Sequence, residues 1–113
     1  VARAAWDETI AVNLTGAFTT IRHAIPHLVA ARTSSIVLIG SPTGLTMSGA
    51  GYSAYAASKA GMMGLGRVIA SDYADRGVRA NVVIPGTIRT PLTEALTEDV
   101  STVQALVRGT PLG

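Results

Sequence analysis

Two short apolar runs separated by a long helical segment constrain the fold of this 113-residue chain more than any other feature. Residues 35–40 and 78–84 are rich in β-branched side chains, which favours strands buried on both faces of a parallel sheet. Residues 52–76 carry helix formers, and Gly77 stands where a glycine commonly ends a helix. Because a strand–helix–strand unit of this length requires parallel strands and a right-handed crossover, the sequence predicts an α/β fold.

Further helices are predicted on either side of this unit. Residues 6–32 show apolar side chains at three- and four-residue spacing, with Asp7 as the expected N-cap. Pro26 predicts a kink near the C-terminal end of that helix. Residues 92–108 read as an amphipathic helix. The predicted order is therefore helix, strand, helix, strand, helix, in one partial domain that spans residues 1–113.

The predicted helix at 52–76 is apolar on nearly all sides and needs cover on more than one of them. Only 14% of the chain is charged, whereas about a quarter is usual in soluble domains. Either the elements are buried on several sides, or a natural partner surface is missing. We expect the intact protein to form a homodimer or homotetramer through helices 6–32 and 52–76.

Several classes of function are disfavoured by composition. The net charge is +2 without a basic run, so we expect no nucleic-acid partner. No cysteine is present, which excludes disulfides, thiolate nucleophiles and cysteine-based metal sites. The apolar stretches are shorter than the roughly 20 residues of a membrane span, and no signal peptide is recognisable. We therefore expect a cytoplasmic protein without membrane contact, and the missing initiator methionine suits a fragment.

Tyr55 and Lys59 carry the strongest chemical signal. At positions i and i+4 of a helix, both side chains project from one face. A tyrosine hydroxyl is a weak acid, and a nearby ammonium favours its ionised form, which suits general acid–base chemistry. The spacing alone is also compatible with an exposed lysine that covers an aromatic ring.

Two loops follow the predicted strands and add polar groups at one edge of the sheet. Ser41 comes directly after the first strand, where side chains face the ligand crevice of open α/β sheets. Its hydroxyl could donate to a substrate oxygen while Tyr55 transfers a proton, or it could be ordinary loop polarity. Residues 85–90 end the second strand and offer backbone donors for an amide, although Thr90 could simply cap the next helix.

Asn13 interrupts an otherwise regular helix. Asn is a poor residue inside a helix because it competes for backbone hydrogen bonds, and Gly16 weakens the same turns. The pair predicts a local kink with a purpose, while a satisfied polar residue at a helix join is the alternative.

Two other patterns carry little weight. Residues 49–54 match a dinucleotide-binding glycine pattern, but Gly49 lies nine residues beyond Gly40 and not at the strand end. His23 and His27 lack the glutamate of a zinc-protease pair, so no metal is expected. Three glycines of the long helix are assigned to close helix packing: Gly61, Gly64 and Gly66.

Four ordered blocks resemble the short-chain dehydrogenase/reductase family. They are Val-Asn-Leu-Thr-Gly at 12–16, Ile-Val-Leu-Ile-Gly-Ser-Pro-Thr-Gly-Leu at 36–45, Tyr-Ala-Ala-Ser-Lys-Ala-Gly at 55–61, and the stretch from Val78 to Pro91. The resemblance implies part of a Rossmann-like doubly wound parallel sheet that lacks the N-terminal cofactor-binding half. It implies hydride transfer between NAD or NADP and a small-molecule ketone or secondary alcohol.

The resemblance also implies a catalytic tetrad. Tyr55 would be the acid/base, and Lys59 would promote its ionisation and hold the nicotinamide ribose. Ser41 would polarise the substrate oxygen. Asn13 would hold the helix kink and a water that links Lys59 to solvent.

The loop after the second strand would hold the cofactor. In the resemblance, Pro85, Gly86 and Ile88 would bind the nicotinamide carboxamide, with Thr90 near the carboxamide or the pyrophosphate. Helix 92–108 would form part of a substrate lid.

The chain departs from the family pattern in two places. Gly40 replaces the usual serine before Ser41, and Pro42 stiffens the position after it. The family's glycine-rich loop and the residue that chooses NAD or NADP are absent from this sequence. We therefore expect the isolated chain to be inactive, to bind NAD(P)H poorly and to aggregate. The competing hypotheses are a non-catalytic dimerisation fragment and an incomplete product without a stable fold.

Overall fold

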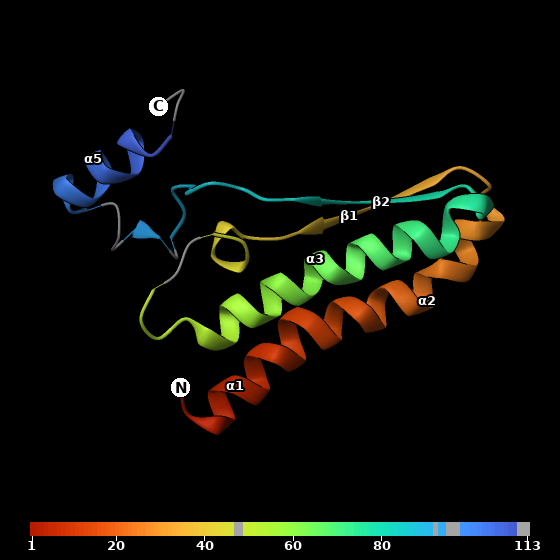
Figure 1. The fold of residues 1–113 in the computed structure, drawn as a ribbon, viewed down its shortest axis with the longest axis horizontal. Helices are drawn as coiled ribbons and strands as arrows, with labels where there is room; N and C mark the ends of the chain where they lie inside the picture. The colour runs from red at the N-terminus through yellow and green to blue at the C-terminus, as the bar shows by residue number, and fades with distance from the viewer. Residues whose placement is uncertain (47–48, 92, 95–97, 111–113) are drawn as a thin grey trace.

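The computed structural model describes residues 1–46, 49–91, 93–94 and 98–110. Its elements follow the predicted order of helix, strand, helix, strand, helix (Figure 1). They are α1 (Arg3–Ile10), a π-helical turn (Ala11–Thr15), α2 (Gly16–Ala30), β1 (Ser34–Ile39), α3 (Ser53–Tyr73), β2 (Val78–Val83) and α5 (Val100–Arg108). Short 3-10 turns follow β1 at Pro42–Gly44 and α3 at Ala74–Arg76.

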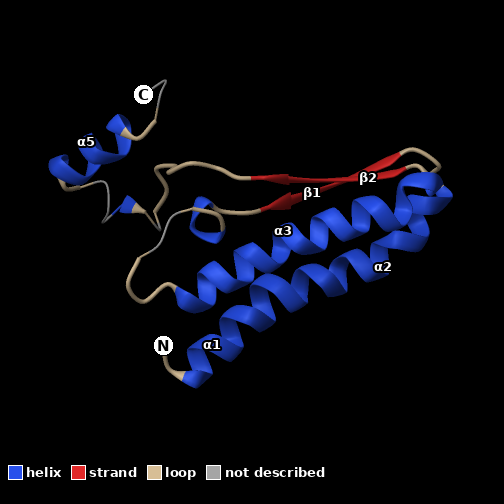
Figure 2. Cartoon of the chain, in the orientation of Figure 1, coloured by secondary structure: helices blue, strands red, loops and turns tan. Residues whose placement is uncertain are grey.

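The two strands form the parallel sheet that the sequence predicts. Ser34 of β1 lies opposite Val78 of β2, and the register continues to Ile39 opposite Val83. α3 crosses from one strand to the other along one face of the sheet (Figure 2). Each strand lies within one residue of its predicted bounds, so the α/β prediction is confirmed.

The two faces of the sheet differ in cover. α3 and α2 lie on the same side, Leu38 is buried against them, and Val78 is also buried (Figure 1). On the opposite face Val37, Ile39 and Val83 are 59%, 51% and 47% exposed. The prediction of strands buried on both faces is therefore wrong for the described part of the chain, since its helices cover a single face.

The core lies between the helices and the covered face of the sheet. Its buried centre is made of one residue of α2, one of β1 and two of α3: Ile21, Leu38, Met62 and Ile69. Gly66 lets α3 approach the sheet closely, since a Cβ there would lie 2.8 Å from Val82 Cγ2. Gly61 does the same for Leu14 at 2.8 Å, whereas Gly64 has no neighbour within 4 Å. The packing assignment thus holds for Gly61 and Gly66 and not for Gly64.

The first helix begins earlier than predicted. α1 starts at Arg3, and Asp7 is not its N-cap. The Arg3 guanidinium donates to both Asp7 carboxylate oxygens at 2.8 and 2.9 Å, so that carboxylate is engaged on the helix surface one turn inside the helix. A π-helical turn includes Asn13, at the place where the sequence predicts a local kink. Pro26 lies inside α2, and the kink expected there remains a prediction.

The ends of the last two helices show how local chemistry sets their bounds. Gly77 has a φ of 75° in the left-handed region and ends the turn after α3, as predicted. Within the helix expected over 92–108, Glu94 is helical, and α5 begins at Val100, where the Asp99 side chain accepts the Thr102 N–H at 2.8 Å as an N-cap. Residues 92 and 95–97 of that prediction lie outside the described part of the chain.

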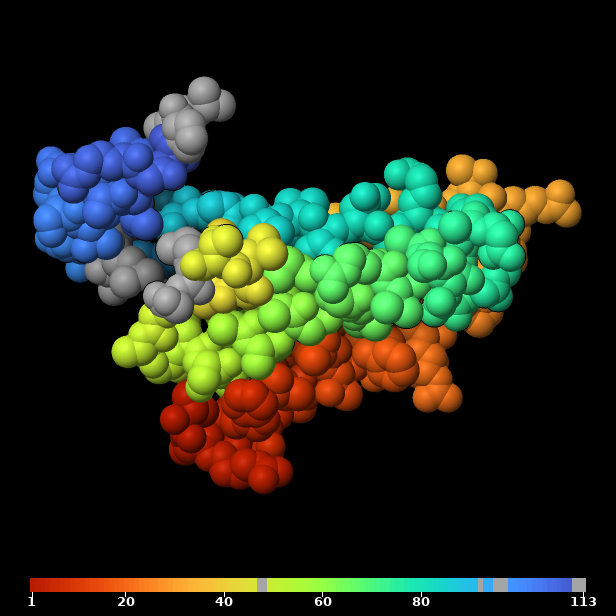
Figure 3. All heavy atoms as spheres, viewed as in Figure 1, coloured from red at the N-terminus to blue at the C-terminus, as the bar shows by residue number. Residues whose placement is uncertain are grey.

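The molecule is elongated, with extents of 50 × 38 × 24 Å. In Figure 3, α5 forms a separate mass at one end, beyond the layered body of helices and sheet. Among the described helices, none combines the length and apolarity that a bilayer crossing requires.

Candidate active site

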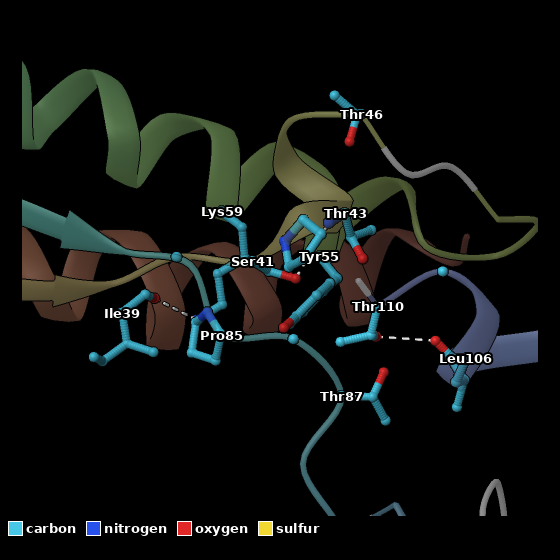
Figure 4. Close-up of a pocket in the computed structure, with 14 residues that line it drawn as sticks. Ile39, Ser41, Thr43, Thr46, Tyr55, Lys59, Pro85, Thr87, Leu106 and Thr110 are labelled. Atoms are coloured by element: carbon cyan, nitrogen blue, oxygen red, sulfur yellow. Dashed lines mark hydrogen bonds between the residues drawn. The ribbon is translucent and has the colours of Figure 1, made fainter. Parts of the chain in front are cut away.

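A pocket of about 620 Å³ lies at the carboxyl ends of the two strands. Its walls come from the end of β1 and the turn after it, from α3, from the loop after β2 and from the end of α5 (Figure 4). The lining residues are Ile39, Gly40, Ser41, Pro42, Thr43, Thr46, Tyr55, Lys59, Pro85, Gly86, Thr87, Leu106, Gly109 and Thr110. This is the edge at which the sequence places the ligand crevice.

Tyr55 and Lys59 lie on consecutive turns of α3 and both line this pocket. The Lys59 Nζ lies 5.7 Å from the centroid of the Tyr55 ring. The same ammonium donates a hydrogen bond of 2.9 Å to the carbonyl oxygen of Ile39, at the end of β1. The Tyr52 ring packs edge-on against the Tyr55 ring, with centroids 6.3 Å apart. The tyrosine is thus held between a second ring and a cation tied to the sheet.

Ser41 is only 8% exposed and lies at the start of the turn that follows β1. Its Oγ accepts the Thr43 N–H at 3.3 Å and caps the 3-10 turn. Gly44 lets that turn approach α3 closely, because a Cβ there would lie 2.7 Å from the backbone nitrogen of Ala60 and 2.8 Å from the Lys59 carbonyl carbon. Figure 4 shows the Ser41 and Tyr55 side chains reaching into the same space.

Gly40 and Pro42, the two departures from the family pattern, fit the local packing. A Cβ at Gly40 would lie 3.0 Å from Val82 Cγ1, so a serine would require this side chain to move. The Gly40 N–H continues the sheet by donating to the Val83 carbonyl at 2.8 Å. Pro42 occupies the first turn of the 3-10 helix, where its missing N–H costs nothing. Both residues therefore support the turn that carries Ser41.

Asn13 does not line the pocket and contacts the site through another side chain. Its Nδ2 donates to the Ser58 Oγ at 3.1 Å, and the Ser58 Oγ donates to the Tyr55 carbonyl oxygen at 2.7 Å. The amide group on the π-helical turn is therefore joined to the turn of α3 that carries Tyr55. The water expected between Asn13 and Lys59 stays a prediction.

The loop after β2 is only partly brought to the pocket. Pro85 and Gly86 line it, whereas Ile88 and Thr90 do not. Ile88 is 60% exposed, and its carbonyl accepts a hydrogen bond of 2.7 Å from the Thr93 Oγ1. The Thr90 Oγ1 accepts the Thr93 N–H at 3.3 Å, which is the local capping alternative considered for this residue.

Several lining residues were not singled out from the sequence. Thr43 and Thr87 lie inside motifs that were recognised, so their positions next to Ser41 and Gly86 could have indicated them. Leu106 lies on the helix that the resemblance assigns to a substrate lid, and Gly109 and Thr110 follow it, but no local pattern singles out these three residues. Within the described ranges, no three side chains of the metal-binding types gather at one place.

Comparison with known proteins identifies the family. The family model for short chain dehydrogenase matches residues 1–101. A 3-oxoacyl-[acyl-carrier-protein] reductase, FabG, from Thermotoga maritima is 42% identical over 82% of this chain and 37% of its own length. A D-beta-hydroxybutyrate dehydrogenase from Rhizobium meliloti is 43% identical over 92% of this chain and 38% of its own length.

A solved structure shows the same fold. The gluconate 5-dehydrogenase from Burkholderia cenocepacia, in complex with NADP and tartrate, superposes with a TM-score of 0.89 at 28% identity. The match covers 98% of this chain and 43% of that one. The chain thus spans about two fifths of the length of the proteins it matches, and it forms part of a Rossmann-like α/β fold. It belongs to the short chain dehydrogenase family of oxidoreductases.

Proposed function

We propose that the full-length protein that carries this sequence is an NAD(P)-dependent oxidoreductase acting on a small-molecule ketone or secondary alcohol, with Tyr55 as the acid/base. One observation carries the proposal: Ser41, Tyr55 and Lys59 arrive from β1 and α3 and line one pocket at the carboxyl ends of the strands. Several relatives named as dehydrogenases or reductases support the class of reaction.

Proton transfer at the substrate oxygen is assigned to these side chains. In the direction of reduction, the Tyr55 hydroxyl gives its proton to the substrate oxygen as the carbonyl carbon gains a hydride. The Ser41 hydroxyl donates a hydrogen bond to the same oxygen and favours the charge that develops there. The Lys59 ammonium, fixed to the Ile39 carbonyl, stabilises the phenolate that Tyr55 becomes. In the direction of oxidation, the same groups act in reverse.

The donor set of the pocket fits the nicotinamide end of a dinucleotide. A nicotinamide cofactor would supply or accept the hydride. The Lys59 ammonium can hold ribose hydroxyls, and the backbone of Pro85 and Gly86, which lines the same pocket, can bind the carboxamide. Ile88 and Thr90 would join these contacts through the loop that follows. Among the described strands, neither is followed by a glycine loop for the pyrophosphate, so that contact falls to other parts of the protein.

Tyr55→Phe in the full-length protein is the first test. Removal of a general acid/base typically costs about 100- to 10,000-fold in rate, so we expect ketone-dependent NAD(P)H oxidation to fall by that order. Tyr52→Phe is the matched control, because its ring contacts Tyr55 while it does not line the pocket. We expect Tyr52→Phe to retain activity, and both variants to keep the melting temperature. A Tyr55→Phe enzyme with near-normal kcat would remove Tyr55 from the mechanism.

The open surfaces support two further parts of the proposal. One face of the sheet is uncovered, so the 113-residue chain alone is proposed to be inactive and to aggregate.

On the helices, Val12, Phe18 and Val68 are 68%, 49% and 57% exposed, which supports assembly of the intact protein through α1–α2 and α3. Light scattering of the intact protein should give a dimer or tetramer, and a clean monomer would contradict this assembly.

A further inference from the structure

Ser58 is a polar side chain that the reaction outlined above does not use. It lies on α3 between Tyr55 and Lys59 and is 0% exposed. The other buried polar residue among those described is Ser41, which lines the pocket. Ser58 does not line the pocket, and its hydroxyl is directed at the helix that carries Asn13. A fully buried hydroxyl is costly unless it is satisfied, so its partners indicate what it does.

The Ser58 hydroxyl joins two elements of the site. Its Oγ accepts from the Asn13 Nδ2 at 3.1 Å and donates to the Tyr55 carbonyl oxygen at 2.7 Å. In an α-helix, the carbonyl of residue i also accepts the N–H of residue i+4. The Tyr55 carbonyl is therefore the acceptor that closes the turn between Tyr55 and Lys59. Ser58 makes its bond to this carbonyl from within α3, three residues after Tyr55, and the Asn13 amide links the same hydroxyl to the π-helical turn.

The neighbouring contact keeps the two helices in one relative position. Leu14 of the π-helical turn packs on Gly61, where a Cβ would lie 2.8 Å from the Leu14 Cδ2. The hydrogen bond from Asn13 to Ser58 and the Leu14–Gly61 contact lie side by side along α3. The π-helical turn therefore contacts α3 at two consecutive places, and the hydrogen bond from Asn13 to Ser58 is the one nearer to Tyr55.

We propose that Ser58 is a positioning residue, through which Asn13 fixes the Tyr55–Lys59 turn of α3 relative to the pocket. This inference rests on the proposed function of Tyr55 and Lys59. It assigns the Asn13 side chain a role through Ser58, in addition to the water link that the family resemblance implies. The hydroxyl acts on geometry alone and exchanges no proton with the substrate.

The test uses three serine variants of the full-length protein. Ser58→Ala removes both hydrogen bonds, Ser58→Cys keeps the size with weaker bonds, and Ser71→Ala changes an exposed serine on the same helix. Misplacement of a catalytic group by a fraction of an ångström to 1 Å lowers rates by about 10- to 100-fold. We expect a kcat loss of that order for Ser58→Ala, with KM within about twofold because substrate contacts remain. Ser58→Cys should be intermediate, and Ser71→Ala should match the wild type.

Two readouts separate positioning from a loss of folded protein. The pH profile of kcat should move in Ser58→Ala, whereas a smaller folded fraction lowers the profile without moving it. Asn13→Ala combined with Ser58→Ala should be no slower than Asn13→Ala alone, since residues that act as a unit are non-additive. Circular dichroism gives the folded fraction for every variant.

The proposal is overturned if Ser58→Ala or, should that variant not fold, Ser58→Cys has wild-type kcat and an unmoved pH profile. It is equally overturned if the loss of rate equals the loss of folded protein. If the wild type is active, Tyr55→Phe is inactive and Ser58→Ala is unaffected, the role of Ser58 is refuted while the proposed function stands. A wild-type protein without ketone-dependent turnover would refute the proposed function itself.

Discussion

α3 and α5 both line the pocket, yet they are held in place by different forces. α3 has no side-chain cap at its start and buries Ala54, Met62 and Ile69 against the rest of the chain. α5 buries none of its residues and begins at a strong cap, the Asp99 carboxylate. One wall of the pocket is thus fixed by packing and the other by local hydrogen bonds. We infer that the packed wall carries the chemistry and the locally held wall adapts to the substrate.

The largest expected effect is a difference in the free energy of unfolding between variants of the α3 wall and variants of the α5 wall. Ile69→Ala removes a side chain from the buried core and should lower the free energy of unfolding by roughly 2–5 kcal/mol. Val107→Ala in α5 removes a half-exposed side chain and should change the free energy of unfolding by less than about 0.5 kcal/mol. Urea unfolding of the full-length variants measures both. Equal losses of stability would contradict the difference between the two helices, because α5 would then be packed as firmly as α3.

A smaller effect is expected on substrate recognition. Leu106 is the large apolar side chain that α5 places in the pocket. Leu106→Ala should reduce kcat/KM for an apolar ketone about tenfold, mainly through KM, because three side-chain carbons are removed from the pocket wall. Steady-state kinetics with Val107→Ala as the neighbouring control would show this. A fall in kcat with unchanged KM would place α5 in the chemistry and contradict its assignment to substrate binding.

The smallest effect concerns the pH dependence of the α5 cap. Hydrogen bonds from the hydroxyls of Ser101 and Thr102 and from the Thr102 N–H lower the pKa of Asp99 to about 2 from 3.8. A carboxyl with a depressed pKa stabilises the folded state above its unfolded value. That stabilisation is lost as the pH falls from about 4 towards 2.

Hydrogen exchange of the α5 amides, corrected for intrinsic rates, should therefore show less protection below pH 4. Asp99→Asn removes the titrating group while it keeps a capping oxygen, and it should flatten this dependence. The amides of α3 serve as the internal control. An unchanged pH dependence in Asp99→Asn would assign the effect to other groups.

Much of the packed wall could be predicted from the sequence. Apolar runs and helical spacing indicated both strands and α3, and the rule for strand ends placed Ser41 beside Tyr55 and Lys59. Gly77 was recognisable because few other residues adopt a positive φ at a helix end. Asn13 indicated an irregular turn at this place, because Asn is unfavourable inside an α-helix.

The features that were missed depend on contacts between distant segments. The open face of the sheet, with Val37 and Val83, could not be known because an apolar run does not show which neighbours cover it. Ser58 is an ordinary helical serine in the sequence, and only its burial against Asn13 gives it a role. The resemblance assigned helix 92–108 to a substrate lid, but that Leu106 is its residue in the pocket depends on the path of the chain after β2, which no local pattern specifies.

The most direct measurement follows the hydride itself. The full-length protein would be given a ketone and NAD(P)H that carries deuterium at the transferable C4 position, in ordinary water. We expect one deuterium on the carbinol carbon of the product, while the hydroxyl proton comes from Tyr55 and exchanges with solvent. Product formed without deuterium on that carbon would contradict direct hydride transfer in this pocket.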